Sequence, residues 1–86
     1  MNTFKLVISS PDGNIFEGNA YKLDLRSSEG EFAIMAGHVP FITSVVSGDC
    51  ALWLDEDTKK DAKSMGGLLT VGKDKTTFIC STFEFK

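Results

Sequence analysis

The strongest constraint on the fold of this chain is an alternation of apolar and polar residues with a period of two. Phe4, Leu6 and Ile8 share one face of an extended segment, and Leu23 and Leu25 share one face of another. The same spacing joins three later pairs, which are Phe32 with Ile34, Leu52 with Leu54, and Leu69 with Val71. This period directs side chains alternately toward a core and toward water, so it predicts β-strands. The segment TTFICSTFEF, residues 76–85, is β-branched and aromatic and also predicts strand.

Short turn signals separate these runs. They are the residues 11–14 (PDGN), 27–30 (SSEG), 37–40 (GHVP), 47–49 (SGD) and 72–75 (GKDK). Gly, Pro, Asn and Asp supply the dihedral angles that tight turns require. Many short strands at this spacing predict an all-β fold, an antiparallel sandwich or barrel. One segment differs: residues 55–63 (DEDTKKDAK) have no apolar face and predict a solvated hairpin loop, with a helical turn as the alternative.

Size and charge limit the possible functions. A chain of 86 residues predicts one domain, residues 1–86, with a modest core. The net charge of −3 gives no reason to expect nucleic acid or an anionic membrane surface as a partner. The sequence contains neither an apolar run of the roughly 20 residues that span a bilayer nor the pattern of a signal peptide.

The two cysteines predict buried thiols. Cys50 and Cys80 lie far apart in the sequence and lack metal-ligand spacing, so we expect no metal site. Without a secretory signal, we favour two reduced thiols that act as small buried hydrophobes over a disulfide.

His38 is the only histidine and therefore the only candidate general base. A catalytic triad needs a serine and an orienting carboxylate beside it, and no G-x-S-x-G sequence is present. We favour a turn histidine whose ring packs on or hydrogen-bonds to neighbouring backbone, with contact to a partner as the intermediate alternative. No catalytic residue is therefore assigned.

Two further motifs have a chemical interpretation and a structural one. Glu29 and Glu31 could form a carboxylate pair, but Gly30 between them indicates an exposed turn, which favours solvation or contact with a polar partner loop. Gly66-Gly67 could suggest a phosphate loop, but Leu-Leu-Thr-Val follows instead of a helix. A glycine bulge at the start of a strand is the favoured interpretation.

An ordered set of motifs resembles the epsilon subunit of F-type ATP synthases, called delta in mitochondria. The set comprises FKLVISSPDGNIFEG (residues 4–18), KLDLRSSEGEFAIMAGHVPFIT (22–43), SMGGLLTV (64–71) and TTFICST (76–82). The resemblance extends over nearly the whole chain. Ala33 stands where the family usually has Gly, and Thr70 where an acidic residue is common. Cys50 and Cys80 replace residues that are more often aliphatic or Ala.

The resemblance implies a fold, a function and two contact surfaces. The implied fold is a ten-stranded antiparallel β-sandwich of two packed sheets. The implied function is that of a non-catalytic rotor subunit, which links the gamma subunit to the membrane c-ring and couples ion flow to ATP synthesis without a cofactor. The matching gamma-facing positions are Ser10, His38 and Thr43. The matching ring-facing turn is Glu29, Gly30, Glu31 and Phe32. The implied location is the cytoplasmic face of a bacterial cell membrane, where the subunit is peripheral through the c-ring.

Two expectations concern what lies outside this match. Most members of the family continue into a C-terminal helical hairpin that regulates hydrolysis and in some members binds ATP. Because this sequence stops at Lys86, we favour a short form that neither inhibits hydrolysis by extension nor binds ATP, with the N-terminal half of a longer protein as the alternative. The alternative function is a free-standing β-sandwich that binds a peptide or a sugar, although Trp53 and Tyr21 are few aromatics for a sugar site.

Overall fold

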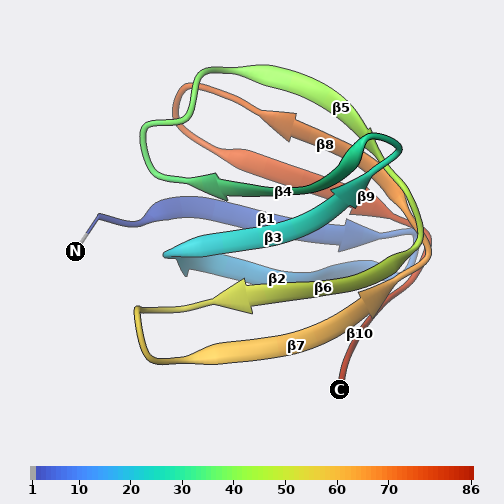
Figure 1. The fold of residues 1–86 in the computed structure, drawn as a ribbon. Helices are drawn as coiled ribbons and strands as arrows, with labels where there is room; N and C mark the ends of the chain where they lie inside the picture. The colour runs from blue at the N-terminus through green and yellow to red at the C-terminus, as the bar shows by residue number, and fades with distance from the viewer. Residues whose placement is uncertain (1) are drawn as a thin grey trace.

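The protein is a sandwich of two five-stranded β-sheets. A computed structural model describes residues 2–86, and in this range it contains ten strands and no helix (Figure 1). The strands are β1 (Phe4–Ser10), β2 (Gly13–Ala20), β3 (Lys22–Ser27), β4 (Gly30–Met35), β5 (Phe41–Val45), β6 (Gly48–Trp53), β7 (Lys59–Ser64), β8 (Gly67–Val71), β9 (Thr76–Cys80) and β10 (Phe83–Phe85). Sheet A has the order β2-β1-β9-β8-β5, and sheet B has the order β10-β7-β6-β3-β4. The predicted all-β sandwich of ten strands is confirmed.

One strand pairing departs from the antiparallel expectation. β1 and β9 lie parallel, with Leu6 opposite Thr76 and Ile8 opposite Phe78, whereas the other pairings between the described strands are antiparallel. This pairing joins the two ends of the chain in the middle of sheet A. Parallel neighbours require a long connection, and here the connection is most of the molecule. No local signal in the sequence specifies such a pairing.

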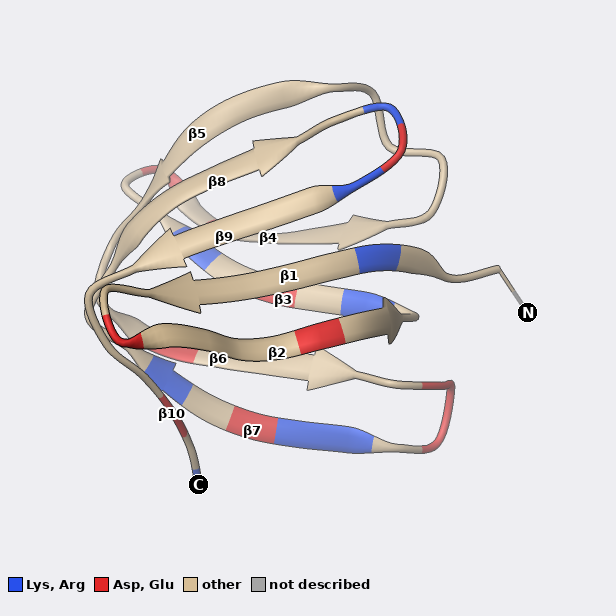
Figure 2. Ribbon diagram, turned by 180° about the vertical axis from the view of Figure 1, so that it is seen from behind, with Lys and Arg blue, Asp and Glu red and all other residues tan. Residues whose placement is uncertain are grey.

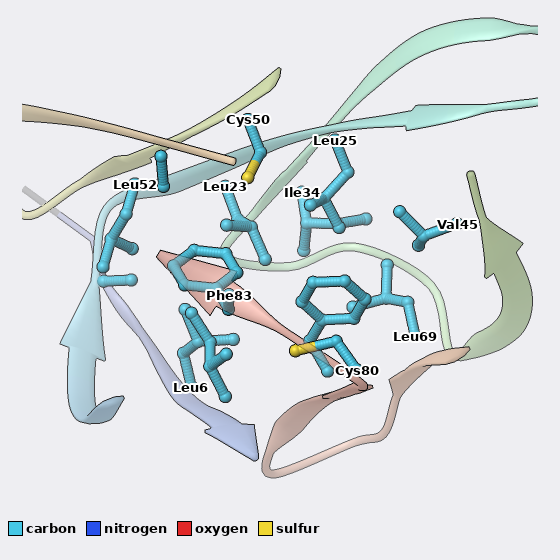
Figure 3. Close-up of a cluster of buried hydrophobic side chains, with 14 of the residues drawn as sticks. Leu6, Leu23, Leu25, Ile34, Val45, Cys50, Leu52, Leu69, Cys80 and Phe83 are labelled. Atoms are coloured by element: carbon cyan, nitrogen blue, oxygen red, sulfur yellow. The ribbon is translucent and has the colours of Figure 1, made fainter. Parts of the chain in front are cut away.

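The core lies between the sheets and is built by the alternating residues. Leu6 and Ile8 of β1, Leu23 and Leu25 of β3, and Phe78 of β9 are almost completely buried. Figure 3 shows Leu6, Leu23 and Leu25 in one cluster with buried side chains from both sheets. The alternation in the sequence therefore identified the inward faces of the strands correctly.

The acidic segment at residues 55–63 was only half correctly predicted. Residues 55–58 form the connection after β6, but β7 begins at Lys59 and includes the rest of the segment. The prediction of a loop failed because the inward face of β7 is very short. It consists of Ala62 and Ser64, which are buried between β6 and β10, while the four charged residues of the strand point to water.

The glycine pair at residues 66–67 is not a bulge. The register through Gly67 is regular on both sides, with Val45 opposite it in β5 and Cys80 opposite it in β9. A Cβ on Gly67 would lie 2.0 Å from the carbonyl oxygen of Ile79, so glycine is required by the closeness of the β9 backbone. Gly66 has a φ of +93°, which other residues rarely adopt.

The last apolar segment is divided between the two sheets. β9 belongs to sheet A, and after Ser81 and Thr82 the chain enters sheet B as β10. The rings of Phe78 and Phe83 meet edge to face across the core, with their centroids 6.2 Å apart. The sequence has continuous strand character here because both pieces are strands. The two residues that cross between the sheets, Ser81 and Thr82, do not interrupt this composition.

Candidate functional site

Two hairpin turns at one end of the sandwich are built alike. In the turn between β1 and β2, the Ser10 hydroxyl donates to the Gly13 carbonyl (3.3 Å) and accepts from the Asp12 amide (3.3 Å). In the turn between β3 and β4, Ser27 makes the same two bonds, to the Gly30 carbonyl (3.1 Å) and from the Glu29 amide (3.2 Å). Both glycines have a φ of +127°. The repeated pattern Ser-x-Asp/Glu-Gly therefore specifies the same turn twice.

These turns place one residue of the predicted gamma-facing set at the same end of the molecule as the predicted ring-facing turn. Ser10 is the last residue of β1. The strand register places Cys80 of β9, Gly67 of β8 and Val45 of β5 at the same end of sheet A. Beyond Val45, the Val46 amide donates to the Arg26 carbonyl (2.9 Å), next to the β3–β4 turn. Figure 1 shows both turns on the side where β1 and β3 end. Ser10, from the gamma-facing set, thus lies at the end that carries Glu29 and Gly30.

His38 lies at the opposite end, in the loop from β4 to β5. Its Nδ1 is 2.9 Å from the carbonyl oxygen of Val39, and its ring centroid is 4.9 Å from that of Phe41. Because a carbonyl only accepts, Nδ1 carries the proton. The side chain is exposed and packs on its own loop, so the interpretation as a turn histidine is confirmed.

A groove runs along the side of the sandwich between β4 and β5, the strands that end sheets B and A. Its volume is about 340 Å³. Phe32 lines it from β4, Phe41 and Thr43 line it from β5, and His38 and Glu29 lie toward its two ends. The groove thus brings together His38 and Thr43 of the gamma-facing set with Glu29 and Phe32 of the ring-facing set.

The remaining predicted positions lie outside this groove. Ser10 is three strand spacings from β5 across sheet A, about 14 Å. Gly30 opens β4, and the Glu31 carboxylate accepts from Arg26 Nη2 (2.8 Å) on the outer face of sheet B. Glu29 and Glu31 therefore diverge, as expected for carboxylates on either side of a turn.

The outer face of sheet B is polar and already paired. Lys22 and Lys59 lie over the ring of Trp53, with each ammonium less than 6 Å from the ring centroid (5.7 and 5.6 Å). The indole N–H of Trp53 donates to Asp24 (3.0 Å). Both lysines also approach carboxylates, Lys22 at 3.6 Å from Asp24 and Lys59 at 3.4 Å from Asp61. These contacts occupy the indole, which leaves little free aromatic surface for a ligand.

The outer face of sheet A carries exposed apolar residues on β5, β8 and β9, and the sequence reasoning missed them. Ile42, Leu68 and Ile79 are 67%, 43% and 52% exposed, and the register places Leu68 next to Ile79 and close to Ile42. Figure 2 shows β5 and β8 without a charged residue, whereas most of β7 is charged. The signal was present, because all three are apolar residues in the outward phase of their strands.

The titratable groups of the interior are the two cysteines. Cys50 and Cys80 are free and buried, as predicted. Burial raises the pKa of the Cys50 thiol to about 11, and it also raises the pKa of Cys80.

Across residues 2–86, no group of three His, Cys, Asp or Glu side chains is placed to hold a metal ion. In the same range, no helix has the length and hydropathy needed to cross a membrane.

Comparison with known proteins identifies the family of this chain. Residues 3–86 match the family model described as the beta-sandwich domain of the ATP synthase delta/epsilon chain. An ATP synthase epsilon chain from Clostridium novyi is 34% identical over 83 residues, which are 96% of this chain and 63% of the relative. A sodium-ion-specific ATP synthase epsilon chain from Acetobacterium woodii is 31% identical over 83 residues, 96% of this chain and 62% of the relative. The chain thus spans under two thirds of the length of these relatives.

A solved structure has the same fold. A chain in the cryo-EM structure of the Euglena gracilis mitochondrial ATP synthase, showing OSCP, F1 and the c-ring in rotational state 1, superposes with a TM-score of 0.89. The match has 18% identity and covers 96% of this chain and 53% of that chain. This structure shows the shared fold, and the match over residues 3–86 shows that the chain belongs to the family of the ATP synthase delta/epsilon chain beta-sandwich domain.

Proposed function

We propose that this chain is an epsilon-type subunit in the central stalk of an F-type ATP synthase. In this role it links the gamma subunit to the c-ring, so that rotation driven by ion flow is transmitted to ATP synthesis. The observation that carries the proposal is the family match over residues 3–86, together with relatives named as ATP synthase epsilon chains. The subunit would be peripheral to the membrane, on the cytoplasmic face of a bacterial cell, through its contact with the ring.

The physical basis of this role is stiffness combined with adjacent binding surfaces. Protein cores are packed as densely as organic crystals and resist deformation. A sandwich whose two sheets share one core can therefore transmit a force from one surface to another with little loss in internal motion. Here the proposed contact residues meet in the groove between β4 and β5 and at the hairpin end beside it.

The two proposed contact surfaces use different residues and share the groove. For gamma we propose Ser10, His38 and Thr43, of which the last two line the groove. For the c-ring we propose the turn and first residues of β4, Glu29, Gly30, Glu31 and Phe32. Glu29 is exposed at a turn tip that is held by the Ser27 hydroxyl, so its carboxylate can meet a polar loop without rearrangement of the backbone.

We propose that the subunit has no catalytic role. His38 is exposed, and the one hydrogen bond described for its ring goes to backbone, which is unlike the base of a triad. The alternative is a free-standing module for a peptide or a sugar. Its sugar form is disfavoured by Trp53, because two lysines and a carboxylate already contact the indole.

Purification of the ATP synthase from detergent-solubilised membranes of the source organism tests the proposal. With the tag on the gamma subunit, this chain should elute in constant proportion to gamma and c-ring protein. A matched preparation that carries the same tag on an unrelated membrane protein should lack it. Recovery of this chain in the soluble fraction, and never with gamma, would refute the assignment.

A substitution in the groove tests the gamma-facing surface. His38→Glu places a negative charge beside Phe41 and Thr43, and we expect about tenfold weaker binding to gamma, equivalent to about 1.4 kcal/mol. Asn19→Glu makes the same charge change on β2, at the far edge of sheet A, and should leave binding unchanged. Both positions are exposed, so both variants should melt as the parent does. Equal binding of gamma by the two variants would show that His38 is not part of the interface.

A further inference from the structure

The free edge of sheet A presents unpaired backbone groups on β5. The Gly72 amide donates to the Lys75 carbonyl (2.9 Å) and closes the β8–β9 hairpin, so the even-numbered residues of β8 bond to β9. Antiparallel pairs alternate between bonded and non-bonded, so the odd-numbered residues of β8 bond to β5. Because Thr43 lies opposite Leu69, residues 41, 43 and 45 face β8. Ile42 and Ser44 therefore direct their N–H and C=O groups away from the sheet.

The contacts at the end of β5 agree with this assignment. Val46 follows in the same phase as Ser44, and its amide points away from β8 to the Arg26 carbonyl (2.9 Å). The Ser44 carbonyl accepts a long bond from the Thr43 hydroxyl (3.4 Å). The amides of Ile42 and Ser44 and the carbonyl of Ile42 thus have no hydrogen-bond partner described within residues 2–86.

β5 also lacks the features that usually protect an edge. Exposed edge strands commonly carry charged residues or proline, which prevent pairing with other chains. The other three edge strands follow this rule, with Glu17 in β2, Glu31 in β4 and Glu84 in β10. β5 reads Phe-Ile-Thr-Ser-Val and has neither a charge nor a proline.

The two sides of this edge are suited to alternating side chains. On the outer side, Ile42 and Leu68 are exposed and lie diagonally across the β5–β8 pair, because Ile42 is opposite Thr70 and Leu68 is opposite Ser44. On the inner side, the groove of about 340 Å³ opens between β5 and β4, lined by Phe32, Phe41 and Thr43. A strand added to β5 would direct successive side chains alternately onto Ile42 and into the groove.

We propose that the β5 edge accepts an extended, largely apolar segment of the partner subunit as a sixth strand of sheet A. Main-chain hydrogen bonds to Ile42 and Ser44 hold the segment, and apolar side chains in the groove select it, which is the mode of strand addition. The inference rests on the proposed function, because the partner is then the gamma subunit. A second copy of this chain fits less well, because its own Phe41 packs against its own core and would leave both grooves unfilled.

Hydrogen exchange of backbone amides, followed by NMR with and without the gamma subunit of the same organism, tests this proposal. The Ile42 and Ser44 amides should exchange at least about tenfold more slowly in the complex. The amides of residues 17–20, at the end of β2 remote from Ser10, serve as the internal control and should be unchanged. Binding of gamma without protection at Ile42 and Ser44 would overturn the inference and leave the proposed function intact.

Two variants separate edge pairing from contact with the outer face. Ser44→Pro removes an outward amide without removing a bond to β8, and it should weaken gamma binding at least about tenfold while the circular dichroism spectrum stays the same. Ile79→Lys changes an exposed residue of the same face, two strands from the edge, and should bind gamma as the parent does. A larger loss for Ile79→Lys than for Ser44→Pro would show that the face, and not the edge, is the docking surface.

Two remaining outcomes contradict the proposal in different ways. Protection of Ile42 and Ser44 in the isolated chain, rising with its concentration together with dimer formation, would assign the edge to a second copy. Absence of any binding to gamma would refute the proposed function itself, and the strand addition with it.

Discussion

Gly67 lies where β8 and β9 approach too closely for any side chain. A Cβ there would lie 2.0 Å from the Ile79 carbonyl oxygen and 2.8 Å from the Cys80 Cα, and both are backbone atoms. At Gly18, in contrast, the nearest atom would be a Phe16 ring carbon at 3.5 Å, an ordinary contact. The two glycines look alike in the sequence, but only the first is required by packing.

We therefore expect Gly67→Ala to lower the free energy of unfolding by about 3 kcal/mol, because β9 must move to relieve the overlap. Gly18→Ala should change it by less than about 1 kcal/mol, in the stabilising direction, since alanine restricts the unfolded chain more than glycine does. Urea denaturation of both variants measures the difference. Equal destabilisation would show that β9 adjusts easily.

Cys50 should make stability depend on pH in the alkaline range. Burial raises the pKa of its thiol from 9.0 to about 11, so between these values the unfolded chain loses a proton that the folded chain keeps. The free energy of unfolding should therefore fall as the pH rises from 9.0 to about 11. The comparison is with Cys50→Ala, whose curve should fall less steeply. Parallel curves for the two proteins would exclude a contribution from this thiol.

At the scale of elements, the two Ser-x-Asp/Glu-Gly turns are local features that the sequence specifies fully. Each serine hydroxyl bonds twice within its own four residues, and each glycine supplies the positive φ. We expect Ser10→Ala and Ser27→Ala to destabilise the fold by similar amounts, about 1 kcal/mol each, which is typical of a lost hydrogen bond. Thermal unfolding of the two variants tests this. A much larger effect at one serine would indicate that it has contacts beyond its turn.

Strand boundaries were less predictable than turns. β7 was hidden because its inward face holds only Ala62 and Ser64, so the alternation that reveals other strands is almost absent. β9 and β10 were not separated in the sequence because the residues on both sides of the crossing have strand character. Both errors occurred where the partner strands, rather than the segment itself, determine the conformation.

At the scale of the whole molecule, the parallel pairing of β1 with β9 joins the two ends of the chain across one core. Leu6 and Ile8 are fully buried beside Phe78, which itself meets Phe83 of the other sheet. No part of this core is complete without both ends of the chain, so residues 1–86 should behave as a single cooperative unit.

We expect far-ultraviolet circular dichroism and Trp53 fluorescence to report the same urea midpoint. The first signal averages over both sheets, whereas the second follows sheet B, so agreement between them means that the sheets unfold together. Leu6→Ala, which opens the core at β1, should shift both midpoints equally, with a cost of about 2 to 5 kcal/mol. Two separate transitions would contradict the single-domain prediction.

The sequence by itself determined the all-β class, the inward faces of most strands, the burial of the cysteines and the form of two turns. These are properties of neighbouring residues, set by side-chain alternation and by local dihedral angles. The motif order also indicated the family before any geometry was known.

Only the tertiary structure decided which strands are neighbours and what the surfaces present. It set Ser10 and His38 at opposite ends, joined His38 and Thr43 to Phe32 in one groove, and left β5 as an uncharged free edge. Pairing between distant strands depends on how one core is filled by the whole chain, and no local pattern encodes that choice. The physical reason is that an edge exists only where a sheet ends, and the end of a sheet is a property of all its strands together.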